Sequence, residues 1–139
     1  MLRRATKDDI KGIKTIENRC FSDSWTENML LQSMENGCIM VVVEVENMLV
    51  GYAGLYPSGD ITNIAVLPEY RGLGYGKMLV SEIIKQAQIN NIDKIFLEVR
   101  SSNITAIKLY EKCGFKRISC RKRYYKDGED ALIYAFGGV

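Results

Sequence analysis

The sequence contains no histidine. That absence excludes a histidine-containing catalytic triad, histidine metal ligands and histidine as a general acid or base. If the protein is an enzyme, its proton transfers fall to carboxylates, tyrosines, lysines, cysteines or water. Long apolar runs are also missing, because the longest strongly apolar segment, residues 38–43, is far too short to cross a bilayer. No apolar stretch follows the charged residues at the N-terminus, so no secretory signal peptide is expected.

Cysteine is sparse and shows no metal-binding spacing. The four cysteines include no C-x-x-C pair, and without histidine a zinc site would need all four thiols or help from carboxylates. We therefore expect no metal. With no secretory signal, reduced thiols buried as small hydrophobic side chains are the simpler interpretation. These features predict a cytoplasmic protein.

The length and composition are those of a folded domain. The 139 residues are 47% hydrophobic and 26% charged, which excludes a disordered or fibrous chain and allows a real core. No linker, repeat or low-complexity segment interrupts the sequence, so residues 1–139 are predicted to form a single domain. The net charge of +2 favours no class of partner.

Basic residues are concentrated near the C-terminus. Between Lys112 and Lys126 the sequence has seven basic residues and no acidic one. Such a segment suits contact with nucleic acid, a ribosomal surface or a phosphorylated cofactor, and a solvent-exposed strand face explains it equally well. Apart from Tyr124 and Tyr125 it lacks the aromatic repetition of a nucleic-acid stacking platform. Direct nucleic-acid binding is therefore not expected, and neither is a membrane partner.

Hydrophobic periodicity and turn residues predict the element order β-α-α-β-β-β-α-β-α-β-β. The expected strands are residues 2–5, 38–45, 48–56, 61–67, 94–99, 115–125 and 131–136. The first helix follows Thr6, and the second is capped by Ser24 or Thr26. The unit from the fourth to the fifth strand requires a parallel, right-handed crossover, whereas the hairpins are antiparallel. The chain is therefore predicted to be an α/β domain with a mixed central β-sheet flanked by helices.

A glycine-rich loop, Arg71–Lys77, lies between the fourth strand and the N-terminus of a helix. Glycines allow a sharp turn and close approach of a ligand, and a helix N-terminus presents free N–H groups to an anion. The loop is thus predicted to hold a phosphate group. It is not a Walker A loop, because Arg stands at position 71 and Lys77 is followed by Met78. It is not the dinucleotide-binding loop either, because its glycines are spaced G-x-G-x-G.

The sequence around this loop is more specific than the glycines alone. Residues 63–76 read Asn-Ile-Ala-Val-x-Pro-x-Tyr-Arg-x-x-Gly-x-Gly. This pattern resembles the acetyl-CoA-binding motif of the GCN5-related N-acetyltransferase (GNAT) family. Residues 97–115 and 121–131 extend the resemblance to the branch that acetylates the N-terminal alanine of a small-subunit ribosomal protein. The resemblance is strong over residues 61–136 and weaker over residues 2–56, where Ser24 replaces an expected proline.

The resemblance implies acetyl-CoA as the cosubstrate and a GNAT fold in which the fourth and fifth strands splay apart to form a slot. Backbone groups of Ile64, Ala65 and Val66 would align the pantetheine arm, and amides of the loop would hold the pyrophosphate. The loop residues assigned to the cofactor in this way are Arg71, Gly72, Leu73, Gly74, Tyr75, Gly76 and Lys77. Asn103 would either reach the pantetheine arm or cap its helix.

The implied reaction is attack of a neutral amine on a thioester. An α-amino group, with a pKa of about 7.7–8.0, is partly neutral at pH 7, so a base has one proton to remove during or before attack. Glu98 matches the proton acceptor of the family, and Tyr110 matches the donor to the departing CoA thiolate. Without the resemblance, Glu98 would be an ordinary strand carboxylate and Tyr110 a core residue. A covalent acetyl-cysteine on Cys113 is less favoured, because that residue is expected to pack at a helix end.

The implied acceptor is the N-terminus of a ribosomal protein. The candidate acceptor-binding residues are Tyr124, Tyr125, Glu129 and Asp130, where an acid would hold the ammonium group of the peptide before its deprotonation. Two other functions compete with this one: acetyl transfer to a lysine side chain or small amine, and a CoA-binding or ribosome-associated module without catalysis. Acceptor loops rather than the fold decide the substrate. The presence of both catalytic candidates argues against a module without catalysis.

Overall fold

The computed structural model of the protein describes residues 1–137. Its strands and helices follow the predicted order, and two short 3-10 turns, η1 (Lys7–Asp9) and η2 (Pro68–Tyr70), are added to them. The strands are β1 (Leu2–Arg4), β2 (Ile39–Val45), β3 (Met48–Leu55), β4 (Ile61–Val66), β5 (Lys94–Arg100), β6 (Lys116–Arg121) and β7 (Ala131–Gly137). The helices are α1 (Ile10–Cys20), α2 (Glu27–Glu35), α3 (Tyr75–Ile89) and α4 (Ile104–Lys112).

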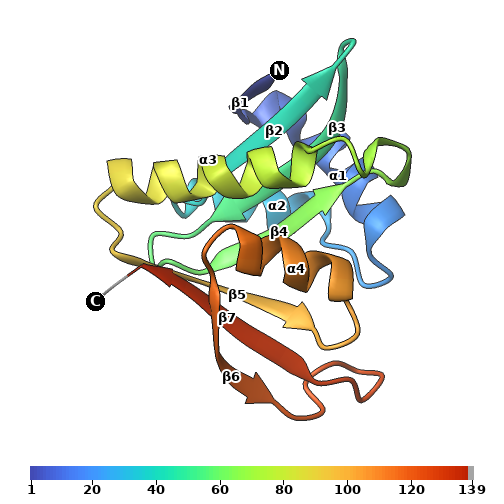
Figure 1. Ribbon diagram of the computed structural model, residues 1–139. Coiled ribbons are helices and arrows are strands. Elements are labelled where there is room, and N and C mark those ends of the chain that lie inside the picture. The colour runs from blue at the N-terminus through green and yellow to red at the C-terminus, as the bar shows by residue number, and fades with distance from the viewer. Residues whose placement is uncertain (138–139) are drawn as a thin grey trace.

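The strands form two sheets that separate at one edge (Figure 1). The first has the order β1-β2-β3-β4 and the second the order β5-β7-β6, and every pairing within them is antiparallel. The predicted parallel neighbours, β4 and β5, touch only at their beginnings, where Asp60 and Phe96 form an isolated parallel bridge. The N–H of Phe96 donates to the carbonyl of Gly59 there, at 2.9 Å. The α/β class is confirmed, with the mixed sheet divided at the place where a splay was expected.

Helices cover both faces of the first sheet. In Figure 1, α3 crosses in front of β2 and β3, while α1 and α2 lie behind them. The predicted apolar stripe of α1 is confirmed, because Ile13 and Ile16 are fully buried. On α3, Leu79 and Ile83 are likewise fully buried against the same sheet. Within residues 1–137, no helix has both the length and the apolar character that a membrane crossing requires.

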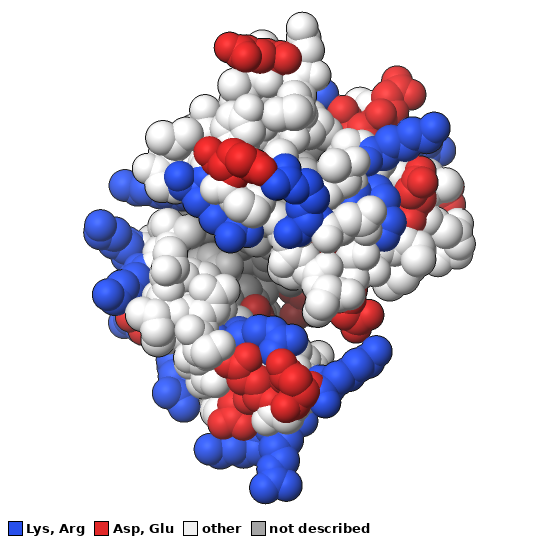
Figure 2. Space-filling model, turned by 90° about the vertical axis from the view of Figure 1, so that its right-hand side faces the viewer, with Lys and Arg blue, Asp and Glu red and all other residues white. Residues whose placement is uncertain are grey.

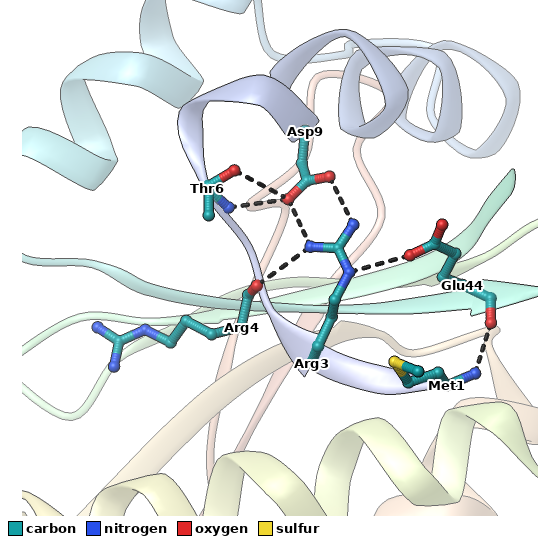
Figure 3. Close-up of polar contacts among 6 residues, drawn as sticks. All are labelled: Met1, Arg3, Arg4, Thr6, Asp9 and Glu44. Carbon is teal, nitrogen blue, oxygen red and sulfur yellow. Dashed lines mark hydrogen bonds and ion pairs between the residues drawn. The ribbon is translucent and has the colours of Figure 1, made fainter. Parts of the chain in front are cut away.

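An ionic cluster fixes the beginning of the chain to the first sheet (Figure 3). The guanidinium of Arg3 donates to both oxygens of Asp9 at 2.8 Å and to Glu44 of β2 at 3.0 Å. Asp9 also accepts the backbone N–H of Thr6 at 2.8 Å, as an acid does at the start of a helix. The hydrogen bonds from Arg3, with its positive charge, lower the pKa of Asp9. The helix start predicted at Thr6 is thereby joined to both β1 and β2.

The structure corrects one predicted boundary and decides between two alternatives at another. The strand predicted over residues 115–125 ends at Arg121, because Arg123 adopts a left-handed conformation with φ of 52° that no strand tolerates. Tyr124 and Tyr125 therefore lie in a loop rather than in β6. Of the two caps considered for the second helix, Thr26 is the one used, and its hydroxyl accepts the N–H of Met29 at 3.1 Å.

Candidate active site

The free edge of β4 lines a slot between the two sheets. Leu67 donates its N–H across to Val50 at 2.8 Å, and successive residues of a strand direct their backbone groups to opposite sides. Ile64 and Val66 therefore direct their backbone groups away from β3, and of these the carbonyl of Val66 is already bound by the side chain of Arg71. Figure 2, seen from the right-hand side of Figure 1, shows the molecule hollowed between an upper and a lower part. The edge of β4 can thus pair with an extended arm as an added strand would.

The glycine-rich loop leads into the first turn of α3 with its amides free. Helix α3 begins at Tyr75, and its first intrahelical hydrogen bond runs from Met78 to the carbonyl of Gly74 at 3.1 Å. The N–H groups of Tyr75, Gly76 and Lys77 consequently have no intrahelical acceptor. Gly74 has a φ of 90°, and a side-chain carbon added there would meet no atom within 4 Å. Free amides beside open space are what a pyrophosphate requires.

Arg71 contributes to this region in a way that the sequence did not indicate. Its Nε donates to the carbonyl of Val66 at 2.9 Å, and Nη2 lies 3.6 Å from the sulfur of Cys20. The thiol of Cys20 approaches the same carbonyl at 3.5 Å. Arg71 therefore holds the end of β4 in place, and the amides of the loop remain the groups suited to a phosphate.

Asn103 serves as a helix cap. Its side-chain oxygen accepts the N–H of Ala106 at 3.2 Å, which makes it the N-cap of α4. Of the two uses predicted for this residue, the structure shows the capping one. The ends of β4 and β5 and the beginnings of α3 and α4 all lie on the right-hand side of Figure 1.

Glu98 lies on the solvent-facing side of β5, among groups from the loop after β6. Its neighbours Leu97 and Val99 are buried, so the alternation of the strand exposes the carboxylate. Arg121 Nη1 lies 3.6 Å from Glu98 Oε1. The hydrogen bond and negative charge of Glu98 raise the pKa of Tyr124. Glu98 is thus an accessible carboxylate held near a tyrosine and a guanidinium.

Tyr110, on α4, is buried, in contrast to the exposed Glu98. Its ring is 8% exposed and packs against Phe115, with 6.1 Å between the ring centroids. Burial, and to a smaller extent the neighbouring Tyr125 hydroxyl, raises the pKa of Tyr110 to about 12. The pKa of Tyr125 is raised too, mainly by burial and secondly by the negative charge of Glu98. The two predicted catalytic residues and the predicted acceptor tyrosines therefore gather in one cluster.

The two tyrosine rings of this cluster contact each other and two guanidinium groups. The guanidinium of Arg100 lies 4.0 Å from the ring centre of Tyr125, and Tyr124 meets Tyr125 edge-on at 5.2 Å. Arg121 lies over the other ring at 5.5 Å. Cation–π contacts of this kind restrict the rings without burying them completely.

The two predicted acceptor acids are engaged within the protein. Glu129 accepts the N–H of Ser102 at 2.7 Å and the guanidinium of Arg100 at 3.0 Å, and these contacts lower its pKa to about 2. Asp130 accepts the N–H of Arg123 at 2.9 Å. Both carboxylates therefore order the loops around the slot. Because each already accepts hydrogen bonds from the protein, neither is free to bind an incoming ammonium group.

One buried acid was not singled out from the sequence. Glu17 is completely buried, and its carboxylate accepts hydrogen bonds from the hydroxyl of Tyr52, the amide of Asn63 and the N–H of Trp25. Its position in the sequence could have revealed it, because an acid four residues after Ile13 falls on the apolar stripe of α1. Among residues 1–137, no group of three or more acids and cysteines is arranged to hold a metal ion.

Comparison with known proteins places the chain in a family. Residues 10–115 match the model of the acetyltransferase (GNAT) family. An N-alpha-acetyltransferase of Saccharolobus solfataricus is 35% identical over 151 residues, covering 96% of this chain and 90% of the relative. The ribosomal protein bS18-alanine N-acetyltransferase of Haemophilus ducreyi is 31% identical over 142 residues, covering 97% and 98%.

A solved structure agrees over almost the whole chain. The crystal structure of the ribosomal-protein-S18-alanine N-acetyltransferase from Escherichia coli has a TM-score of 0.89 at 28% identity, covering 99% of this chain and 92% of the other. The two proteins thus share the overall fold. The match to the family model and the two relatives above 30% identity show that this chain belongs to the acetyltransferase (GNAT) family and is an N-acetyltransferase.

Proposed function

We propose that the protein transfers the acetyl group of acetyl-CoA to the α-amino group of an N-terminal alanine on a small-subunit ribosomal protein. The transfer is direct, within a ternary complex, and residues 1–139 act as one catalytic domain. The observation that carries this proposal is the slot between β4 and β5. It has a free strand edge and free amides of α3, together with a carboxylate from β5 and two tyrosines from the loop after β6. The names of the relatives that cover the whole chain support the choice of acceptor.

The proposed binding of acetyl-CoA uses backbone groups. The N–H and C=O of Ile64 and the N–H of Val66 pair with the pantetheine arm at the edge of β4, and the amides of Tyr75, Gly76 and Lys77 hold the pyrophosphate. The dipole of α3 adds to the attraction for the anion. This arrangement directs the thioester toward the end of β4, beside the cluster that contains Glu98.

The proposed chemistry divides the two proton transfers between Glu98 and Tyr110. The amine nitrogen attacks the carbonyl carbon of the thioester, and its proton passes to the Glu98 carboxylate directly or through water. The carbon–sulfur bond then breaks, and the thiolate takes a proton from the Tyr110 hydroxyl. Because the pKa of Tyr110 is raised to about 12, this residue is protonated at neutral pH and is ready to donate.

The test is acetyl transfer measured by intact-mass spectrometry on peptides that differ only in their first residue. We expect a single acetyl gain on peptides with a free N-terminal alanine and none on the same peptides with a blocked N-terminus. A blocked peptide containing lysine, and a polyamine, complete the panel. Transfer to these amines instead of the alanine peptide would contradict the proposed acceptor. Binding of acetyl-CoA without transfer to any amine would contradict the proposed catalysis.

A further inference from the structure

The buried carboxylate of Glu17 joins three parts of the molecule that are distant in sequence. Its Oε1 accepts the backbone N–H of Trp25 at 2.9 Å, in the loop between α1 and α2. Its Oε2 accepts the amide of Asn63 on β4 at 2.8 Å and the hydroxyl of Tyr52 on β3. Glu17 itself is 0% exposed. A carboxylate buried in this way is costly unless its oxygens are satisfied, and here three donors satisfy them.

The loop held by Glu17, residues 21–26, is attached to α1 through the backbone of Phe21 and Trp25 and the side chain of Ser24. Both backbone polar groups of Trp25 bind charged side chains of α1, because Lys14 Nζ donates to the Trp25 carbonyl at 2.7 Å. The rings of Phe21 and Trp25 pack against the core, whereas Asp23 is exposed. The loop has no regular secondary structure of its own, so these bonds to α1 determine where it lies.

This loop lies at the mouth of the slot. It begins directly after Cys20, whose thiol contacts the carbonyl of Val66 at the end of β4. Across the slot, Asp23 pairs with Lys126 at 3.5 Å, and Lys126 follows Tyr125 in the loop after β6. In Figure 1 the loop after α1 reaches the side on which β4 and β5 end. An acceptor that approaches the end of β4 therefore passes between this loop and the two tyrosines.

We infer that Glu17 is a positioning residue for the acceptor peptide. Its carboxylate binds both the Trp25 loop and Asn63, which comes one residue before Ile64 on β4, and so fixes the position of the loop relative to the edge of β4. One buried carboxylate thereby positions both the loop that faces the acceptor and the strand that faces the thioester. This inference rests on the proposed function, because it assigns the loop to a peptide that the enzyme acetylates.

Three variants separate positioning from general stability. Glu17→Met keeps the length of the side chain but removes both acceptors. Glu17→Gln keeps an oxygen for the Trp25 N–H, while its NH₂ group faces the hydroxyl oxygen of Tyr52 and the amide of Asn63, which turns over to present its oxygen. Tyr52→Phe removes a different hydrogen bond to the same carboxylate and leaves the bond to the loop in place.

We expect Glu17→Met to raise the KM for the alanine peptide about tenfold or more, with the KM for acetyl-CoA changed less than about twofold. Glu17→Gln should recover the peptide KM to within about threefold of the wild-type protein, and Tyr52→Phe should leave it unchanged. A proportional rise in both KM values, or an equal effect of Tyr52→Phe, would show a merely structural role and overturn the inference.

Trp25 supplies a readout that is independent of turnover. It is the only tryptophan in the chain, so its fluorescence reports on this loop alone. In Glu17→Met we expect a shifted emission and a weakened response to added peptide, together with faster hydrogen exchange at the Trp25 amide. If this variant does not fold, the Trp25 amide of the wild-type protein decides, because exchange as fast as in exposed loops would overturn the inference.

The two proposals fail in different ways. If the wild-type protein acetylates no peptide but Trp25 behaves as expected, the proposed function fails while the attachment of the loop to Glu17 stands. If alanine peptides are acetylated and Glu17→Met leaves their KM unchanged, the function stands and the positioning role is wrong.

Discussion

The two predicted catalytic residues are placed in opposite environments by their elements. Glu98 points outward from β5 and remains accessible, whereas Tyr110 is buried on α4 beside Phe115. An accessible carboxylate can exchange a proton with an amine or with water. A buried phenol with a raised pKa stays protonated at neutral pH, so its O–H group is present to hydrogen-bond to the departing sulfur and to share its proton with it. The difference between the two environments matches the difference between the two roles.

Glu98→Gln should lower kcat by about 10²–10⁴-fold, because the amide accepts no proton from the attacking amine. Tyr110→Phe should lower kcat while the KM for acetyl-CoA stays nearly constant. Since burial raises the pKa of Tyr110 to about 12, the wild-type rate should show no loss from Tyr110 ionisation as the pH rises through 10. Steady-state kinetics across this range checks both variants. Unchanged turnover in either one would remove that residue from the mechanism.

Thr62 offers a prediction about stability alone. Its hydroxyl is buried beside Gly54 and has no hydrogen-bond partner within residues 1–137. Thr62→Val replaces that hydroxyl by a methyl group of similar shape and removes an unsatisfied polar atom. We expect an unfolding free energy equal to the wild-type value or higher by up to about 1 kcal/mol, measured by urea denaturation. A clear loss of stability would indicate a partner for this hydroxyl.

At the scale of elements, the loop before α3 is suited to a ligand because the space beside Gly74 is open. Gly74 has a left-handed φ of 90°, and its surroundings are open within 4 Å. Gly74→Ala should therefore raise the KM for acetyl-CoA about tenfold or more, since its methyl group enters the space of the pyrophosphate. Gly128→Ala is the matched control, with a φ of 87° and equally open surroundings away from the loop. Equal kinetic effects of the two substitutions would contradict the role of the loop.

The start of α1 carries a prediction about pH. Asp9 has a lowered pKa because Arg3 donates to both of its oxygens. A lowered folded-state pKa stabilises the protein above the ordinary aspartate value of about 3.9, and the contribution disappears as the pH falls through the folded value. Asp9→Asn should cost about 1–2 kcal/mol at neutral pH and progressively less in acid. Denaturation curves at pH 7 and pH 3 measure this difference, which should not grow toward low pH.

The sequence predicts elements well where a local pattern determines them. The stripe of Ile13 and Ile16 and the glycine-rich loop are such patterns, and both occupy the predicted places. The predicted end of β6 was wrong because the sequence around Arg123 looks like a strand, while its left-handed backbone is stabilised by Asp130 seven residues away. Contacts across long distances in sequence, such as Glu17 with Asn63, produce no local pattern.

The assignments of individual site residues remain predictions, and the structure separates them into two kinds. Backbone groups of Ile64, Val66 and the start of α3 follow from the strand and helix themselves. Side chains such as Glu129 depend on partners that the sequence does not show, and its engagement with Arg100 and Ser102 emerged only from the fold. A role in binding an acceptor ammonium would require Glu129 to give up these bonds.

At the scale of the whole molecule, the slot exists because the two sheets touch at one end only. The contact is made by Gly59 and Asp60 with the beginning of β5, where the Gly59 carbonyl accepts the N–H of Phe96 at 2.9 Å. From this joint, β4 and β5 diverge toward the side that carries the ends of both strands (Figure 1). The angle between the sheets, and with it the width of the slot, therefore depends on a few residues at the joint.

Gly59→Ala tests this dependence. Gly59 has a φ of 95°, and an added side-chain carbon would lie 2.4 Å from the backbone oxygen of Lys94, so the joint would have to open. Gly128→Ala carries the strain of a similar φ without that clash and should cost about 1 kcal/mol. We expect Gly59→Ala to cost at least about 2 kcal/mol more than this control, measured by urea denaturation. We also expect it to lower kcat/KM for acetyl transfer, because Glu98 would move relative to the edge of β4. If Gly59→Ala lost no more stability than this control and kept the wild-type kcat/KM, the joint would not set the geometry of the slot.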